Sequence, residues 1–160
     1  MSIIGISCYY HDSSAALISE EGEIIAAVEE ERFTRKKHDS SFPFHSISYC
    51  LNIAINRKDF VSRYIYYEKP IRLFMRIVET STKSSPRGFT SFHAAMKQWL
   101  TKKLFISNDL KNNLSLLDDK FNKQNLFYSS HHTSHASSAF YPSPFKEAAI
   151  LCIDGVGEWS

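Results

Sequence analysis

Two histidines near the end of the chain, His131 and His135, have a spacing that suits metal binding. Residues four positions apart lie on one face of an α-helix, so a helix here brings both imidazoles close enough to share an ion. Asp154 follows 19 residues after His135, at the end of an apolar segment. Two imidazoles and a carboxylate suit a divalent iron or a similar ion. The sequence therefore predicts a metal site built from these three residues.

The residues around the histidines favour a metal site over the alternative, in which both are polar side chains on an exposed helix. Ser129, Ser130, Thr133 and Ser134 supply hydrogen-bonding groups that can orient the imidazole rings from outside the ligand set. His132 stands where a zinc protease helix of the His-Glu-x-x-His type carries its glutamate. The general base of such a protease is missing, which argues against that activity.

The turn that follows Asp154 is a candidate phosphate contact. Its sequence is Asp-Gly-Val-Gly, with glycines at Gly155 and Gly157. A strand that ends in an aspartate before a glycine-rich turn presents backbone N–H groups to a phosphate, while the aspartate holds a cation. Two glycines also suit a simple β-turn, and the histidine pair is what favours the phosphate interpretation.

Two further groups, a histidine and a set of cations, are candidates for chemistry. His11 lies between two predicted strands, and Asp12 beside it can orient its imidazole. Histidine titrates near neutral pH, so it suits a general base, although a water-exposed turn histidine is an equal alternative. Lys36, Lys37 and Arg87 can neutralise a phosphate or carboxylate, but ordinary surface charge is the simpler interpretation of each.

The elements that must position these residues follow from the hydrophobic pattern. We expect strands at Ile3–Tyr10, Ala15–Ser19, Ile24–Glu30, Tyr64–Tyr67, Leu126–Tyr128 and Ala148–Ile153. The first three form an antiparallel meander, and the last is an apolar strand buried on both faces. We expect helices at Phe44–Ile55, Ile71–Glu79, Phe92–Leu104, Ser107–Phe121 and through the histidines as far as Tyr141, with a loop at Ser81–Gly88. The helix over 107–121 is expected to face solvent.

This order of elements predicts an α/β fold. It is the order of the first lobe of a ribonuclease-H-like architecture, with residues 70–123 as a helical insertion. The chain has 160 residues, of which 43% are hydrophobic, and this is enough for one domain with a real core. A formal net charge of +2 gives no argument for nucleic acid or an anionic membrane as a partner.

The three cysteines and the N-terminus bear on the compartment. Cys8 and Cys152 lie in apolar segments and are interpreted as small buried side chains in a reducing environment. With Cys50 the cysteines number three, which is odd, and none of them has the spacing of a metal-binding motif. The N-terminus has no features of a signal peptide, and no apolar run approaches the roughly 20 residues that span a bilayer. The sequence therefore predicts a cytoplasmic protein with no membrane partner.

Six strings of the sequence, in order, match a known family. They are H-D-S-S-A-A-L from His11, V-E-E-E-R-F-T-R-K-K-H-D from Val28, Y-Y-E-K-P from Tyr66, S-P-R-G from Ser85, the histidine string from His131, and D-G-V-G-E-W from Asp154. Together they resemble the O-carbamoyltransferases of the nodulation-protein U, cephalosporin-hydroxymethyl and tobramycin type. The resemblance covers essentially the whole chain.

The resemblance implies a reaction and a site. Family members use ATP and carbamoyl phosphate to make carbamoyl adenylate, then pass the carbamoyl group to a hydroxyl of a small molecule such as a sugar or an antibiotic. The transfer domain has an actin-like, duplicated ribonuclease-H-like fold and holds an iron-type metal through two histidines and two aspartates. The implied roles are metal ligation for His131, His135 and Asp154, general base for His11, and contacts to the intermediate or acceptor for Asp12, Lys36, Gly155 and Gly157.

Length is where the chain departs from the family, whose members are several times longer. We therefore expect residues 1–160 to be an incomplete N-terminal lobe. The fourth metal ligand, the second lobe and the C-terminal domain that makes carbamoyl adenylate would then come from a missing region or a separate subunit, and the isolated chain would be inactive. Two alternatives remain: a catalytically inactive remnant or metal-binding module, and threonylcarbamoyl transfer to tRNA. The weak charge counts against the second.

Overall fold

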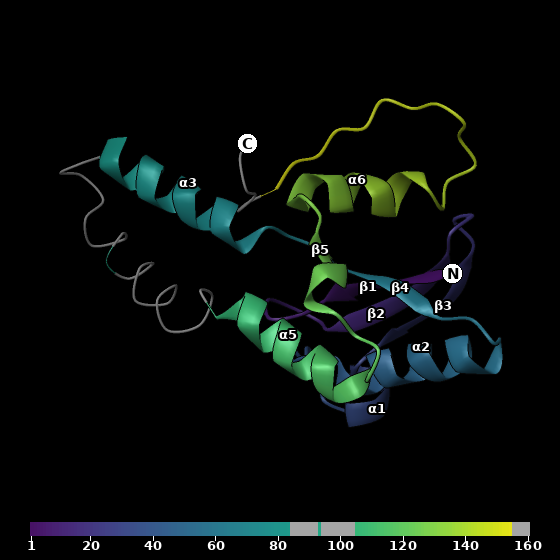
Figure 1. The fold of residues 1–160 in the computed structure, drawn as a ribbon. Coiled ribbons are helices and arrows are strands. Elements are labelled where there is room, and N and C mark those ends of the chain that lie inside the picture. The colour runs from purple at the N-terminus through teal and green to yellow at the C-terminus, as the bar shows by residue number, and fades with distance from the viewer. Residues whose placement is uncertain (84–92, 94–104, 155–160) are drawn as a thin grey trace. The chain divides into compact units, whose positions relative to one another are not determined.

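The main feature of the fold is a five-stranded sheet (Figure 1). The structure is a computed structural model, and it describes residues 1–83, 93 and 105–154. The chain divides into two units, one made of Met1–Tyr67 with Asn108–Tyr128 and the other of Glu68–Ser107 with Ser129–Ser160. None of the helices that the structure describes has the length and apolar character that a membrane crossing requires.

The first unit contains the whole sheet. Its strands are β1 (Ser2–Ser7), β2 (Ser14–Ser19), β3 (Ile24–Glu29), β4 (Val61–Tyr66) and β5 (Leu126–Tyr128), in the order β3-β2-β1-β4-β5. β1 pairs antiparallel with β2, and β2 pairs antiparallel with β3. β4 is parallel to β1, and β5 is parallel to β4. The α/β class, the antiparallel meander and the predicted strand near Leu126 are therefore confirmed.

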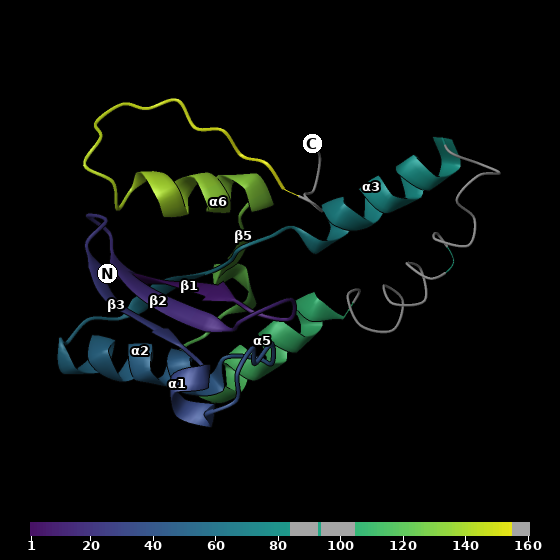
Figure 2. The ribbon, with the colours of Figure 1, turned by 180° about the vertical axis from the view of Figure 1, so that it is seen from behind.

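Alternating side chains of the central strands make the core. Ile4 and Ile6 of β1 are buried, as are Tyr64 and Tyr66 of β4, because side chains two residues apart point to the same face of a sheet. Helix α2 (Phe44–Asn56) packs against β1, β2 and β3. Both ribbon views show α2 and α5 (Ile106–Leu117) over one face of the sheet (Figures 1 and 2). The predicted helix at 44–55 is thus confirmed.

Two helix predictions need correction. The solvent-facing character expected for residues 107–121 is wrong, because Leu110 and Leu114 of α5 are fully buried one helical turn apart. Helix α3 (Pro70–Lys83) continues through the start of the loop predicted at Ser81–Gly88, and an ion pair of 2.6 Å joins Lys83 Nζ to Glu79 Oε1 across its last turn. The rest of that loop and the predicted helix at Phe92–Leu104, except for His93, lie outside the described residues.

The buried strand predicted at Ala148–Ile153 is also wrong. The segment has no strand assignment, and Leu151 and Ile153 are 84% and 85% exposed. A strand needs a neighbour for its backbone hydrogen bonds, and no strand of the described residues pairs with this segment. Cys152 is accordingly half-buried, whereas Cys8 and Cys50 are buried as small core side chains.

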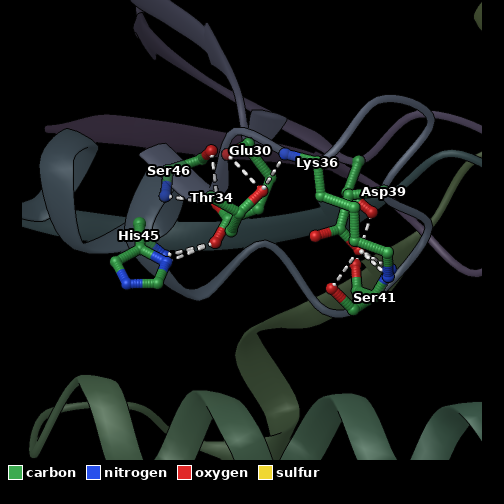
Figure 3. A network of polar contacts seen from close by, with 8 residues as sticks. Glu30, Thr34, Lys36, Asp39, Ser41, His45 and Ser46 are labelled. Carbon is green, nitrogen blue, oxygen red and sulfur yellow. Dashed lines mark hydrogen bonds and ion pairs between the residues drawn. The ribbon is translucent and has the colours of Figure 1, made fainter. Parts of the chain in front are cut away.

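A buried carboxylate, Glu30, ties the end of β3 to the start of α2 (Figure 3). It accepts hydrogen bonds from the backbone N–H groups of His45 (3.0 Å) and Ser46 (2.8 Å), and from the Ser46 hydroxyl (2.7 Å). The N-cap position of α2 is Pro43, which makes no side-chain cap. The N–H groups of a first helical turn need acceptors, so Glu30 supplies from another segment the cap that the local sequence lacks.

Hydrogen bonding keeps Glu30 ionised although it is only 2% exposed. Burial opposes ionisation, but the hydrogen bonds from Ser46 and His45 together outweigh burial and hold the pKa of Glu30 below its usual value. A carboxyl with a lowered folded-state pKa stabilises the fold above its unfolded-state pKa. That stabilisation is lost as the pH falls through the folded-state value.

Replacing Glu30 should destabilise the protein strongly. We expect Glu30→Ala to lower the free energy of unfolding at pH 7 by about 3 kcal/mol, because two helix N–H groups and a buried hydroxyl lose their charged acceptor. Urea titration followed by circular dichroism measures this, and the difference from wild type should shrink between about pH 5 and pH 3. Glu29→Ala removes the neighbouring exposed carboxylate and should cost no more than about 0.5 kcal/mol. Equal effects of the two substitutions would contradict the capping role.

Candidate metal centre and N-terminal loops

The two histidines lie on α6 (His131–Phe140), as the sequence predicts. Ser130 precedes the helix in an extended conformation, and its carbonyl accepts the first helical hydrogen bond, from Ser134 N–H at 3.0 Å. This start places His131 in the first turn and His135 one turn further along the same face. The helix ends at Phe140, before the two prolines that cannot continue it.

The three predicted ligand side chains converge within the second unit. Asp154 Oδ2 lies 2.6 Å from His131 Nε2 and 3.8 Å from His135 Nε2. The two Nε2 atoms are 3.1 Å apart, and the imidazole rings meet edge to face at a centroid distance of 4.6 Å. Among the described residues, these three side chains form a group that could hold one metal ion between their ligand atoms. Their role as ligands stays a prediction.

The geometry of this cluster fits one divalent cation. In a tetrahedral site, ligand atoms about 2.0–2.2 Å from a common ion lie about 3.3–3.6 Å from one another. The observed separations of 2.6, 3.1 and 3.8 Å bracket that range, so small side-chain movements are enough to seat an ion. Imidazole nitrogen and carboxylate oxygen together suit iron, zinc or manganese.

The cluster has a buried side and an open side. The His131 side chain is 13% exposed, whereas that of His135 is 56% exposed. A metal centre that takes part in chemistry needs a position that protein ligands leave free. The His135 side is therefore the accessible side of the cluster.

A further acidic residue beside the cluster escaped the sequence analysis. Glu68 is buried, and its Oε2 lies 3.9 Å from Nδ1 of His131. Glu68 and His131 are 63 positions apart, so neither spacing nor periodicity relates them. Glu68 belongs to the string Y-Y-E-K-P, but the match of that string to the family does not indicate which residue Glu68 contacts.

The loop after β1 presents His11 to solvent from an anchored base. Tyr9 has a left-handed backbone, with φ of 72°, which a residue with a side chain adopts only when its surroundings hold it there. Its N–H donates to Ser40 O at 2.8 Å, and its hydroxyl donates to Asp109. His11 is exposed, and its ring contacts that of Tyr10 edge to face at 4.3 Å.

A second loop, residues 35–41, lies alongside the first. The Ser13 N–H donates to Asp39 O at 2.8 Å. Asp12 Oδ1 lies 3.0 Å from His38 Nδ1. The sequence predicts that Asp12 orients the ring of His11, but its partner is His38, which the sequence does not indicate. Lys36 Nζ lies 3.4 Å from Asp39 Oδ1 (Figure 3). The predicted contacts Asp12 and Lys36 thus sit on neighbouring loops, each with a partner of its own.

Asp39 fixes the shape of this second loop. Hydrogen bonds from the hydroxyl and N–H of Ser41, at 2.6 and 3.1 Å, lower the pKa of Asp39 to about 2. Its side chain is buried, so these bonds hold an ionised carboxylate under the loop that carries Lys36. Gly155, Gly157 and Arg87, the other predicted contacts, lie outside the described residues.

Fold and site together define a mixed α/β domain with a histidine–aspartate cluster, and the comparisons with known proteins place it in a family. The family model described as carbamoyltransferase N-terminus matches residues 2–160. The chain therefore belongs to the family of carbamoyltransferase N-terminal domains, and the resemblance found in its sequence is confirmed.

Three curated relatives match nearly the whole chain. The protein sll1178 of Synechocystis is 53% identical over 99% of the chain. The nodulation protein NolNO of Sinorhizobium fredii is 33% identical over 95% of it, and the protein MJ1051 of Methanocaldococcus jannaschii is 30% identical over 98%. The chain spans 26%, 20% and 22% of the lengths of these three relatives.

Proposed function

We propose that this chain forms the N-terminal part of an enzyme that transfers a carbamoyl group to a hydroxyl of a small molecule. The donor is carbamoyl adenylate, made from ATP and carbamoyl phosphate, and the acceptor is a sugar or an antibiotic-like molecule. Because ATP and carbamoyl phosphate are metabolites of the cytoplasm, the proposal places the enzyme there. The observation that carries the proposal is the convergence of His131, His135 and Asp154 in a domain of the carbamoyltransferase family.

In this proposal the three side chains hold a divalent cation, with Fe²⁺ suited to their mixed nitrogen and oxygen donors. When bound, the cation supplies Lewis acidity that stabilises negative charge on the oxygens of a mixed carbamic–phosphoric anhydride. The contribution of the chain is to fix the ligands on α6 and at Asp154 and to leave the exposed His135 side open to the substrate.

His11 acts as the general base. A neutral imidazole accepts the proton of the acceptor hydroxyl as its oxygen bonds to the carbamoyl carbon. The bond from that carbon to the phosphate oxygen then breaks, and AMP leaves. The hydrogen bonds of Tyr9 hold the base of the loop while His11 stays accessible. Asp12, Lys36, Gly155 and Gly157 contact the intermediate or the acceptor.

The domain organisation is part of the same proposal. The order of three antiparallel strands, a helix and a parallel strand supports the first lobe of an actin-like, ribonuclease-H-like fold, with the insertion at about 70–123. The relatives are four to five times longer, which supports a second lobe and an adenylate-forming domain elsewhere in the protein or in a partner subunit.

An assay of transfer tests this proposal. The 160-residue chain alone, given ATP, carbamoyl phosphate and a panel of hydroxyl acceptors, should transfer no carbamoyl group. A fusion of the chain to the remaining part of sll1178 should do so. Transfer by the chain alone would refute the proposed division of labour. A fusion that makes carbamoyl adenylate but carbamoylates no small-molecule hydroxyl, or carbamoylates only tRNA, would refute the proposed function.

A further inference from the structure

A buried carboxylate lies behind the candidate metal centre. Glu68 stands between the end of β4 and the start of α3 and is 7% exposed. Its Oε2 is 3.9 Å from Nδ1 of His131. The other ring nitrogen of His131, Nε2, is the one that faces Asp154 and His135. The imidazole of His131 therefore lies between the ligand cluster on one side and Glu68 on the other.

The chemistry of imidazole couples its two nitrogens. A neutral ring with its proton on Nδ1 has its lone pair on Nε2, and a hydrogen bond from Nδ1–H selects that form and orients the ring. A carboxylate close to Nδ1 favours the proton at that position. Burying a carboxylate is costly unless it interacts with polar or charged groups, and the imidazole of His131 is one such group beside Glu68.

We infer that Glu68 is a positioning residue of the metal centre, one that holds the His131 ring with Nε2 directed at the cation. This inference rests on the proposed metal site. At 3.9 Å the contact is electrostatic and longer than a hydrogen bond. A cation on Nε2 would make Nδ1–H a stronger donor towards Glu68. Glu68 acts through His131 rather than as a ligand, because its carboxylate faces the nitrogen opposite the cluster.

Titration of the 160-residue chain with Co²⁺ tests the inference. The visible absorption of Co²⁺ reports both its affinity and its ligand geometry. We expect Glu68→Gln, which keeps an acceptor oxygen, to weaken binding about 10-fold, and Glu68→Ala to weaken it up to about 100-fold. The Co²⁺ absorption bands should shift in both variants. Glu79→Gln, which neutralises a carboxylate on α3 that pairs with Lys83, is the matched control and should bind as wild type does.

The outcomes separate this inference from the proposed function. If wild type binds Co²⁺, His131→Ala abolishes binding and Glu68→Gln changes neither affinity nor spectrum, Glu68 has no positioning role while the metal site stands. If Glu68→Gln abolishes binding as completely as His131→Ala does, Glu68 is a ligand and the inference is wrong. If wild type binds no Co²⁺, the metal site and the inference both fail. Thermal unfolding shows whether each variant is folded. If Glu68→Ala does not fold, Glu68→Gln, which keeps the shape of the side chain, decides whether Glu68 positions the ring of His131.

Discussion

His131→Ala and His135→Ala are each expected to weaken binding of Fe²⁺ or Co²⁺ by about 100-fold or more. Each substitution removes one of three protein ligands, and the remaining pair cannot enclose the ion. The two rings lie one helical turn apart with their Nε2 atoms 3.1 Å from each other, so neither can replace the other. Anaerobic equilibrium dialysis with metal analysis measures the affinities.

His132→Ala is the matched control for the ligand substitutions. It removes a histidine from the same helix, and this residue is not part of the converging group. Its variant should keep the affinity of wild type within a few-fold once its fold is verified by circular dichroism. A loss of binding in His132→Ala equal to that in His131→Ala would contradict the ligand assignment.

His11→Asn is expected to slow carbamoyl transfer by about 10²- to 10⁴-fold in the fusion with the remaining part of sll1178. Asparagine keeps polar atoms at the loop tip but cannot take up a proton near neutral pH. The transfer step is measured in a single turnover from carbamoyl adenylate supplied directly, so that adenylate formation does not limit the rate. Metal affinity should not change.

His38→Asn is the control for this effect. His38 is exposed on the neighbouring loop, 82% by its side chain, and its ring contacts Asp12. Because the proposal gives it no proton to move, its replacement should slow transfer by less than about 10-fold. An equal loss in His38→Asn and His11→Asn would assign the effect to loop structure and not to a general base.

The sequence was sufficient to predict elements whose signal is local. Alternation of apolar side chains predicted the antiparallel meander, and the 3.6-residue period predicted the helix at 44–55. The histidine helix followed from the same reasoning. These features depend on residues within a few positions of one another.

Features that depend on distant residues were not predictable. Ala148–Ile153 has the composition of a buried strand, but a strand also needs a paired neighbour, which composition does not supply. The polar residues around the leucines of α5 predict a solvent-facing helix, yet Leu110 and Leu114 are buried in the core. The cap of α2 by Glu30 joins residues 15 and 16 positions apart across a turn and a short helix, α1 (Glu31–Thr34).

The candidate site shows the same division. The spacing of His131 and His135 is a local signal. Their contact with Asp154 depends on residues 141–153, which bring Asp154 back to the helix. Glu68 and His38 are recognised only by their tertiary contacts, Glu68 with His131 and His38 with Asp12. Neither pairing leaves a trace in the spacing of residues along the chain.

Anomalous X-ray diffraction from crystals of the chain grown with Co²⁺ tests the central claim most directly. We expect one strong peak at the cobalt edge, about 2.0–2.2 Å from His131 Nε2, His135 Nε2 and an Asp154 carboxylate oxygen. A peak held by other side chains, or no peak at millimolar Co²⁺, would contradict the account.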